Sequence, residues 1–165
     1  MKLYPIIATA LIAFIANGCA KKETAQAAVA APAPAAESGV RVIELTGNDQ
    51  MKYNMTSIDL KVGEEVKITL TNVGQMPKQG MAHNLVVLKP GTDVAAFAIA
   101  AAPLAMGKDN VPEAKKSEVV AHTKMLGPKE SDSITLKFSE PGVYEFICTF
   151  PGHFQLGMKG TITVQ

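Results

Sequence analysis

The sequence predicts an all-β fold for residues 40–165, a sandwich of short strands with one helical insertion. Short segments alternate apolar with polar side chains or are rich in β-branched residues, which is typical of strands with one buried face. Clusters of turn-forming residues separate these segments at short intervals. The 126 residues from Val40 to Gln165 also suffice for one domain with one core. Several short strands at this spacing indicate an antiparallel sandwich or barrel.

Residues 1–18 have the pattern of an export signal. Lys2 precedes the apolar run Tyr4–Ala16, which is too short to span a bilayer comfortably and leads into Asn17-Gly18-Cys19. A cysteine directly after a glycine resembles the bacterial lipoprotein signal, in which that cysteine is acylated and becomes the first mature residue. Residues 1–18 are therefore predicted to be a lipoprotein-type signal peptide, with lipidation at Cys19. Ordinary cleavage nearby is the alternative, because the two residues before Gly18 depart from the usual pattern.

Residues 19–39 are predicted to be a flexible tether. The segment is mostly Ala and Pro and lacks the large apolar side chains that would offset the entropy of ordering it. A coil of this length reaches about 25 Å on average. The protein is thus expected at the periplasmic or outer surface of a membrane, with residues 40–165 held away from the lipid anchor.

The predicted strands lie where the alternation is clearest. They cover residues 40–46, 66–73, 133–138, 143–148 and 161–164. Turn signals lie at residues 46–49, 62–65, 126–131 and 140–142. Two further apolar strands are expected, one that starts near His83 and one that ends near His122.

One segment, residues 92–106, departs from the period of two. It is rich in Ala, has a candidate N-cap at Thr92 or Asp93, and contains a helix breaker at Pro103. We therefore expect a short helix that stops near Pro103 and packs on the outside of the sandwich.

The charge of the predicted domain excludes one large class of function. The chain has 16 basic and 15 acidic residues, of which three and two precede Val40, so the domain has no formal net charge. A nucleic-acid-binding domain needs a basic footprint, which this domain lacks. A protein partner bound through an uncharged, mainly apolar patch fits the composition better.

The most informative stretch of the sequence is Cys148–Met158, "CTFPGHFQLGM", in which a thiol, an imidazole and a thioether recur at five-residue intervals. Cys148, His153 and Met158 form a set of soft and borderline donors that favours copper over magnesium, calcium or manganese. A copper site for electron transfer needs a second nitrogen in the plane of the thiolate and the first imidazole.

Only two other histidines, His83 and His122, can supply this nitrogen. His83 begins an apolar strand and is followed by Asn84, which could hydrogen-bond to Thr149 and tie the two ligand segments together. His122 ends a strand and is interpreted as a surface histidine. His83 is therefore the expected second nitrogen ligand.

These motifs together resemble the cupredoxin family, and within it the azurins and auracyanins. The shared segments stand in the same order: "GNDQMKYN" (47–54), "MAHN" (81–84), "VVAHTKMLG" (119–127), "CTFPGH" (148–153) and "MKGTITV" (158–164). The resemblance implies a Greek-key sandwich and one type 1 copper. It implies His83, Cys148 and His153 as strong ligands and Met158 as the axial ligand.

Three features depart from the azurin pattern. The gap between His153 and Met158 is four residues, as in the auracyanins, rather than three. Ala82 replaces the glycine before the first ligand histidine, which puts a backbone carbonyl contact to copper at this position in question. The structural disulfide is absent, because Cys19 belongs to the anchor and Cys148 to the metal.

The predicted function is that of an exported blue copper protein, not an enzyme, that shuttles single electrons by Cu(II)/Cu(I) cycling. Electrons are expected to pass through the edge of His153 at the surface. The redox partners would be a c-type cytochrome or a membrane oxidase or reductase. They would dock on an apolar patch formed by Met76, Met81, Phe150, Phe154, Leu156 and Gly157.

Other functions fit the residues less well. A cysteine enzyme with Cys148 as nucleophile would leave Met158 without a role, and multicopper enzymes need more histidines than the three present. The main alternative is a periplasmic copper carrier or storage lipoprotein. The scattered methionines Met51, Met55, Met106 and Met125 more simply fill gaps in the core.

Overall fold

The computed structural model describes residues 39–104 and 107–165. The predicted signal peptide (1–18), the lipidation site Cys19 and nearly all of the predicted tether (19–39) lie outside the described residues, as does Met106. Among the described residues, no helix is both long enough and apolar enough to cross a membrane.

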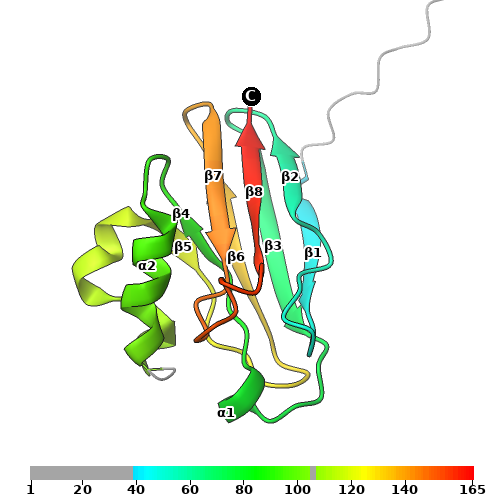
Figure 1. The fold of residues 1–165 in the computed structure, drawn as a ribbon. Coiled ribbons are helices and arrows are strands. Elements are labelled where there is room, and N and C mark those ends of the chain that lie inside the picture. The colour runs from blue at the N-terminus through cyan, green and yellow to red at the C-terminus, as the bar shows by residue number, and fades with distance from the viewer. Residues whose placement is uncertain (1–38, 105–106) are drawn as a thin grey trace, which may run out of the picture. The chain divides into compact units, whose positions relative to one another are not determined.

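The described residues form a sandwich of two sheets (Figure 1). One sheet has the strand order β1-β3-β6, and the other has the order β2-β8-β7-β4-β5. The strands are β1 (Arg41–Gly47), β2 (Ser57–Leu60), β3 (Glu65–Asn72), β4 (Val86–Leu88), β5 (Val119–His122), β6 (Ser131–Lys137), β7 (Gly142–Ile147) and β8 (Lys159–Val164). The predicted strands are all present with ends shifted by one or two residues, except that the strand expected near His83 begins at Val86. β2 was not predicted.

The sandwich is predicted correctly, but two of its strand pairs are parallel rather than antiparallel. β1 pairs parallel with β3, and β2 pairs parallel with β8, whereas the other pairs are antiparallel. Consecutive strands β1 and β2 lie in different sheets, so each pairs with a strand distant in sequence. Alternation of side chains predicts that a strand exists but carries no information on its direction.

The main core fills the space between the two sheets. It contains alternate residues of the strands, among them Leu45, Ile68, Val87, Phe146 and Ile162, all fully buried. Every second residue of β1 and β3 turns inward, which is the pattern that the sequence alternation predicts.

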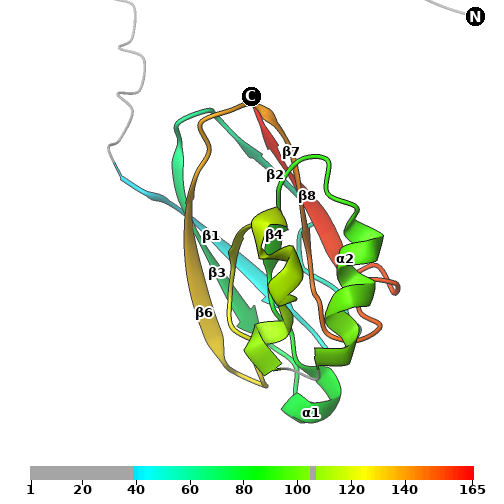
Figure 2. The same ribbon diagram turned by 90° about the vertical axis from the view of Figure 1, so that its left-hand side faces the viewer.

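A second, smaller core lies on the outer face of the five-stranded sheet. Here α2 (Val94–Ala101) packs Val94, Phe97 and Ala98 against Val86 and Leu88 of β4 and Ile147 of β7, as predicted for the insertion. Figure 2 shows this helical region in front of β4. Asp93 caps the helix by accepting a hydrogen bond from the Ala96 N–H at 3.0 Å. The helix ends at Ala101 and is followed by a 3-10 turn, Ala102–Leu104, that contains Pro103.

Short helical segments that the sequence analysis did not predict complete the fold. They are α1 (Lys78–Met81) and 3-10 turns at Gly107–Asn110 and Glu113–Glu118. α1 lies at the end of the sandwich where β7 passes into β8 (Figure 1).

The strand order places the predicted ligands together. β7 lies between β4 and β8, with Val86 opposite Ile147 and Ile147 opposite Lys159. The residues just outside these strand ends are the segment before β4, which holds His83, and the loop Cys148–Met158. The ligand segments therefore meet at one end of the five-stranded sheet, where β4 and β8 begin and β7 ends.

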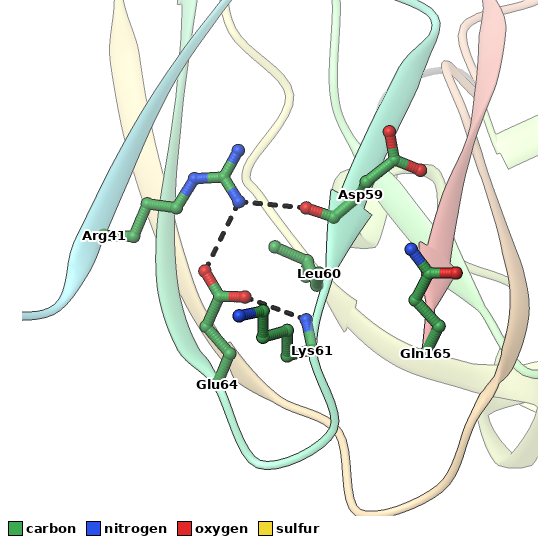
Figure 3. Close-up of a pocket in the computed structure, with 6 residues that line it drawn as sticks. All are labelled: Arg41, Asp59, Leu60, Lys61, Glu64 and Gln165. Atoms are coloured by element: carbon green, nitrogen blue, oxygen red, sulfur yellow. Dashed lines mark hydrogen bonds and ion pairs between the residues drawn. The ribbon is translucent and has the colours of Figure 1, made fainter. Parts of the chain in front are cut away.

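The opposite end of the sandwich is held by a different set of contacts. Arg41 of β1 donates to the Asp59 carbonyl of β2 at 2.9 Å and pairs with the Glu64 carboxylate at 3.3 Å, which links the two sheets (Figure 3). The shallow pocket around Arg41 also contains Gln165, the last residue after β8. Since β8 runs away from Met158 over its whole length, this pocket is remote from the predicted ligands.

Candidate metal centre

Three predicted ligands meet in the interior near the end of β7. The donor atoms of His83, Cys148 and His153 lie within 4.8 Å of one another. The Cys148 sulfur is 3.4 Å from Nδ1 of His153 and 4.0 Å from Nδ1 of His83. Both imidazoles therefore present Nδ1 to the thiol. His83, Cys148 and His153 are the one such cluster that the described residues 39–104 and 107–165 contain.

The loop from Cys148 to Met158 is closed by its own backbone. The Cys148 N–H donates to the Met158 carbonyl at 3.0 Å, and the Met158 N–H donates to the His153 carbonyl at 2.9 Å. The His153 N–H in turn donates to the Phe150 carbonyl at 3.0 Å. These bonds fold the four-residue gap before Met158 back onto the cysteine, so the fully buried Met158 lies beside the three donors.

Gly47, at the end of β1, allows the ligands to pack this closely. A Cβ atom at this position would lie 2.9 Å from Cδ2 of His83 and 2.9 Å from Cε of Met158. The absence of a side chain therefore leaves room for one histidine and the methionine on the same side of the site. The sequence analysis did not assign a role to Gly47, although it opens the "GNDQMKYN" motif.

Burial disfavours every charged form of the metal-free site. It raises the pKa of the Cys148 thiol to about 12, although the Asn84 and Phe150 N–H groups lower it. Burial and, to a lesser extent, the neighbouring His83 together lower the pKa of His153 to about 4. The pKa of His83 is lowered by burial and is partly restored by the Asn48 carbonyl and by Asp49. Neutral imidazoles are the form that binds a metal.

Asn84 and Thr149, the residues that follow two of the ligands, are joined by two hydrogen bonds. The Asn84 Nδ2 donates to Thr149 Oγ1 at 2.8 Å, and the Thr149 N–H donates to Asn84 Oδ1 at 2.9 Å. Both residues are buried, and the Tyr53 hydroxyl donates to the Asn84 carbonyl. The two ligand segments are thus linked immediately beside His83 and Cys148.

The edge of His153, the predicted path for electrons, is less exposed than expected. His153 is only 2% exposed, whereas His83, Cys148 and Met158 are 0% exposed. The Phe150 ring packs on the His153 ring with centroids 4.5 Å apart, which covers much of the imidazole. Among the four residues, His153 still comes nearest to solvent.

The residues of the predicted docking patch differ widely in exposure. Met76 and Leu156 are 44% and 56% exposed, while Phe150, Phe154 and Gly157 are half-buried. Met81, the last residue of α1, is only 8% exposed and can add little to such a surface. Lys52, which the sequence analysis did not consider, donates to the Leu156 carbonyl at 2.6 Å.

The other predicted residues lie as follows. His122 is exposed at the end of β5, outside the ligand cluster. Ala82 is buried with φ −86° and ψ 155°, an extended conformation that alanine adopts without strain, so the change from glycine costs nothing here. A contact from its carbonyl to copper stays a prediction.

The donor set fits copper. Two neutral imidazoles and a thiol that becomes a thiolate, with a thioether in the same dry pocket, are the ligands expected for a blue copper centre. His83, Cys148, His153 and Met158 are arranged as one type 1 copper site. The fold and the site together define a small copper protein of the cupredoxin class.

Comparison with known proteins agrees with this class. The family model described as "Copper binding proteins, plastocyanin/azurin family" matches residues 41–165. Azurin from Pseudomonas aeruginosa is 38% identical over 141 residues, which cover 83% of this chain and 91% of that protein. Auracyanin-B from Chloroflexus aurantiacus is 36% identical over 151 residues, which cover 88% of this chain and 63% of that protein.

A solved structure shows the same fold. The crystal structure of dithionite-reduced auracyanin from Roseiflexus castenholzii superposes with a TM-score of 0.66 at 34% identity, covering 77% of this chain and 99% of that one. The chain belongs to the plastocyanin/azurin family of copper-binding proteins. The resemblance to azurins and auracyanins seen in the motifs is confirmed.

Proposed function

We propose that the protein is an exported carrier of single electrons between redox proteins. The observation that supports this most directly is the enclosed, mixed donor set of His83, Cys148, His153 and Met158. When bound there, copper supplies the chemistry by alternating between Cu(II) and Cu(I). Ligands held by strand ends and by the Asn84–Thr149 bonds reduce the rearrangement that accompanies each electron.

The surroundings of the site favour the lower charge of the reduced metal. Cys148 and Met158 are fully buried, and Phe150 stacks against His153, so water is kept from the donors. We expect this exclusion of water to raise the reduction potential. Electrons would enter and leave at His153, in the same loop as the exposed Leu156, where a c-type cytochrome or a membrane oxidase or reductase would dock.

The test is the visible spectrum of the full-length protein loaded with Cu(II). An intense thiolate-to-copper band that disappears on reduction is expected, and Cys148→Ser should abolish it without unfolding the protein. The reduced protein is also expected to be oxidised rapidly by a c-type cytochrome. A protein that binds only Cu(I), or binds Cu(II) without colour, would contradict the electron-carrier function.

The alternative is a copper carrier or storage protein. Such proteins offer open, exchangeable clusters of methionine or histidine, whereas Met51 and Met55 here pack against the core and Met125 is buried. Transfer of copper to a metal-free acceptor protein, at a rate faster than electron exchange with a cytochrome, would favour this alternative.

The location of the protein is proposed from the sequence alone. Residues 1–18 would direct export, acylated Cys19 would hold the protein on a membrane, and residues 19–39 would let the domain reach its partners. In cells that process lipoproteins, wild-type protein should fractionate with membranes and Cys19→Ser with the soluble exported proteins. Equal distribution of both proteins would favour ordinary signal cleavage.

A further inference from the structure

The 3-10 turn Gly107–Asn110, in the helical region between β4 and β5, ends in a sharp turn, Asp109-Asn110, that contacts both ligand segments. Asp109 and Asn110 have φ values of 54° and 56°. This left-handed region is unfavourable for residues that carry a Cβ, and two such residues in succession are unusual. Asn110 is completely buried, although it follows the half-buried Asp109 on a 3-10 turn.

Asn110 completes the set of hydrogen bonds around Thr149. Asn84 occupies the N–H and the hydroxyl of Thr149, and Asn110 Nδ2 donates to the remaining group, the Thr149 carbonyl, at 3.0 Å. All three polar groups of the residue after Cys148 are therefore fixed by two buried asparagines. Asn84 holds the position of Thr149, and Asn110 holds the peptide plane that leads on to Phe150.

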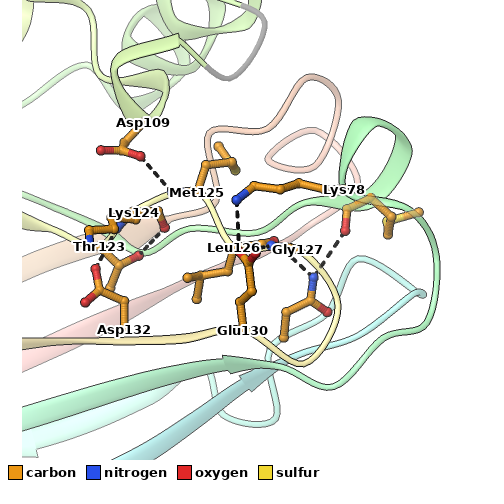
Figure 4. A network of polar contacts seen from close by, with 11 residues as sticks. Lys78, Asp109, Thr123, Lys124, Met125, Leu126, Gly127, Glu130 and Asp132 are labelled. Atoms are coloured by element: carbon orange, nitrogen blue, oxygen red, sulfur yellow. Dashed lines mark hydrogen bonds and ion pairs between the residues drawn. The ribbon is translucent and has the colours of Figure 1, made fainter.

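Asp109 binds the other ligand segment. Its carbonyl accepts a hydrogen bond from Asn84 Nδ2 at 2.7 Å, directly after His83. Its carboxylate accepts one from the Met125 N–H at 3.0 Å, which Figure 4 shows as a dashed line. The next residue, Leu126, exchanges both backbone hydrogen bonds with His83, at 2.8 and 3.0 Å.

The conformation of the turn alone does not explain the residues found there. Glycine adopts positive φ with less strain than asparagine and would serve a simple turn. An asparagine at this position keeps an amide donor directed at the segment that carries Cys148. We propose that Asn110, supported by Asp109, is a positioning residue for the copper centre, through which the insertion holds the His83 and Cys148 segments in register.

The inference rests on the proposed metal site but not on electron transfer. Asn110→Asp keeps the shape and the tolerance of positive φ but replaces the donor with an acceptor. Asn110→Gly removes the side chain and leaves a backbone that accepts the turn. Asn54→Gly is the control, because the Asn54 side chain bonds to Thr46 and Glu44 of β1 and, among the described residues, to neither ligand segment.

Three measurements on the full-length protein test the proposal. In the metal-free protein, exchange of the Phe150 amide hydrogen, which lies in the peptide plane that Asn110 holds, should be about tenfold faster in both Asn110 variants. Zn(II) should bind at least about tenfold more weakly to them, as is typical when a group that orients a ligand is lost. The Cu(II) form should show a shifted thiolate-to-copper band, and Asn54→Gly should resemble wild type in all three.

The outcomes separate this proposal from the proposed function. Asn110 variants that lose stability to denaturant, yet keep wild-type amide exchange, Zn(II) affinity and visible spectrum, would show that Asn110 is merely structural. If Asn110→Asp does not fold, the comparison of amide exchange, Zn(II) affinity and visible spectrum with wild type is made on Asn110→Gly alone. A wild-type protein without the visible band would contradict the electron-carrier function, whereas unchanged Zn(II) affinity in the variants would overturn the present inference.

Discussion

Burial and metal binding have opposite effects on the charge of Cys148. The metal-free protein holds a neutral thiol, with a pKa of about 12, whereas a bound metal requires the thiolate. Binding at neutral pH must therefore release a proton from Cys148. His83 and His153 are already neutral there, since burial lowers the pKa of both. The two histidines are thus ready to bind, and the cysteine carries the pH dependence of metal affinity near neutrality.

The metal-free protein should lose stability in mild acid because of His153. Its pKa falls from 6.5 to about 4 on folding, so the unfolded chain binds the proton first. The stabilisation is complete above pH 6.5 and declines as the pH falls toward 4, by up to about 3 kcal/mol. Urea unfolding of the metal-free protein at several pH values measures this decline.

The variant His153→Gln isolates the contribution of this one residue. Carboxylates such as Glu64 and Glu130, whose pKa is lowered by hydrogen bonds, also reduce stability in acid, but they are common to both proteins. The variant should show a shallower decline between pH 6.5 and 4. Identical slopes for the two proteins would show that His153 is not responsible.

Gly47→Ala should damage the copper centre more than the fold. The new Cβ would press on His83 and Met158 at 2.9 Å, and overpacking of this kind costs about 1–3 kcal/mol. Because both contacts are to ligands, we expect weaker copper binding and a changed visible band. Gly80→Ala is the matched control, since nothing lies within 4 Å of its added Cβ. Equal copper affinity in both variants would contradict the proposed role of Gly47.

At the scale of elements, strand order decides where the chemistry occurs. β4, β7 and β8 are neighbours, so the segment before β4 and the loop between β7 and β8 share one end of the sheet. α2 packs on the outer face of β4 and β7, against residues that include Val86 and Ile147 at this end of the sheet. The insertion therefore both buries the strands that position the ligands and, through Asp109 and Asn110, reaches the ligand segments.

Loss of the Asp93 cap should weaken this element. Asp93→Ala leaves the Ala96 N–H without its side-chain acceptor and should cost about 1 kcal/mol of unfolding free energy. Asp93→Asn, which keeps an acceptor of equal capping strength, should be close to wild type. Denaturant unfolding of the copper-loaded proteins measures both. A loss as large for asparagine as for alanine would point to the charge of Asp93 rather than to its hydrogen bond.

At the scale of the whole molecule, the two ends of the sandwich are specialised differently. One end encloses the metal ligands and carries the exposed side chain of Leu156, which lies in the loop between Cys148 and Met158. The other joins the sheets through Arg41, Asp59 and Glu64 (Figure 3) and contains the C-terminal Gln165. A partner that exchanges electrons should bind at the first end, because electron transfer requires a short path to the metal.

Leu156→Glu should slow electron exchange with a c-type cytochrome, because a buried charge at the contact opposes docking. Val143→Glu is the control, since Val143 of β7 is 53% exposed, close to the 56% of Leu156, but lies at the far end of the sandwich. We expect at least a tenfold lower rate constant for Leu156→Glu, or about 1.4 kcal/mol, with an unchanged spectrum. Stopped-flow oxidation of the reduced proteins compares them, and equal rates would remove Leu156 from the docking surface.

Much of the site was predictable because it is local. Cys148, His153 and Met158 lie in one loop, and their spacing and donor types suffice to suggest copper. His83 lies 65 residues from Cys148, yet only three histidines are present, and Asn84 beside it marked it as the candidate. Gly47, Lys52, Asp109 and Asn110 were missed, since each acts on a segment distant in sequence and none carries a thiol, thioether or imidazole that would suggest a copper ligand.

The sequence by itself determined every strand except β2, the capped helix, the donor set and the family, because alternation, turn residues and ligand spacing are properties of short segments. Only the tertiary structure decided the parallel pairings, the burial of His153 beneath Phe150 and the contact of Asp109-Asn110 with both ligand segments. These features depend on which distant segments pack together. That packing minimises exposed apolar surface over the whole chain, and no short stretch of sequence specifies it alone.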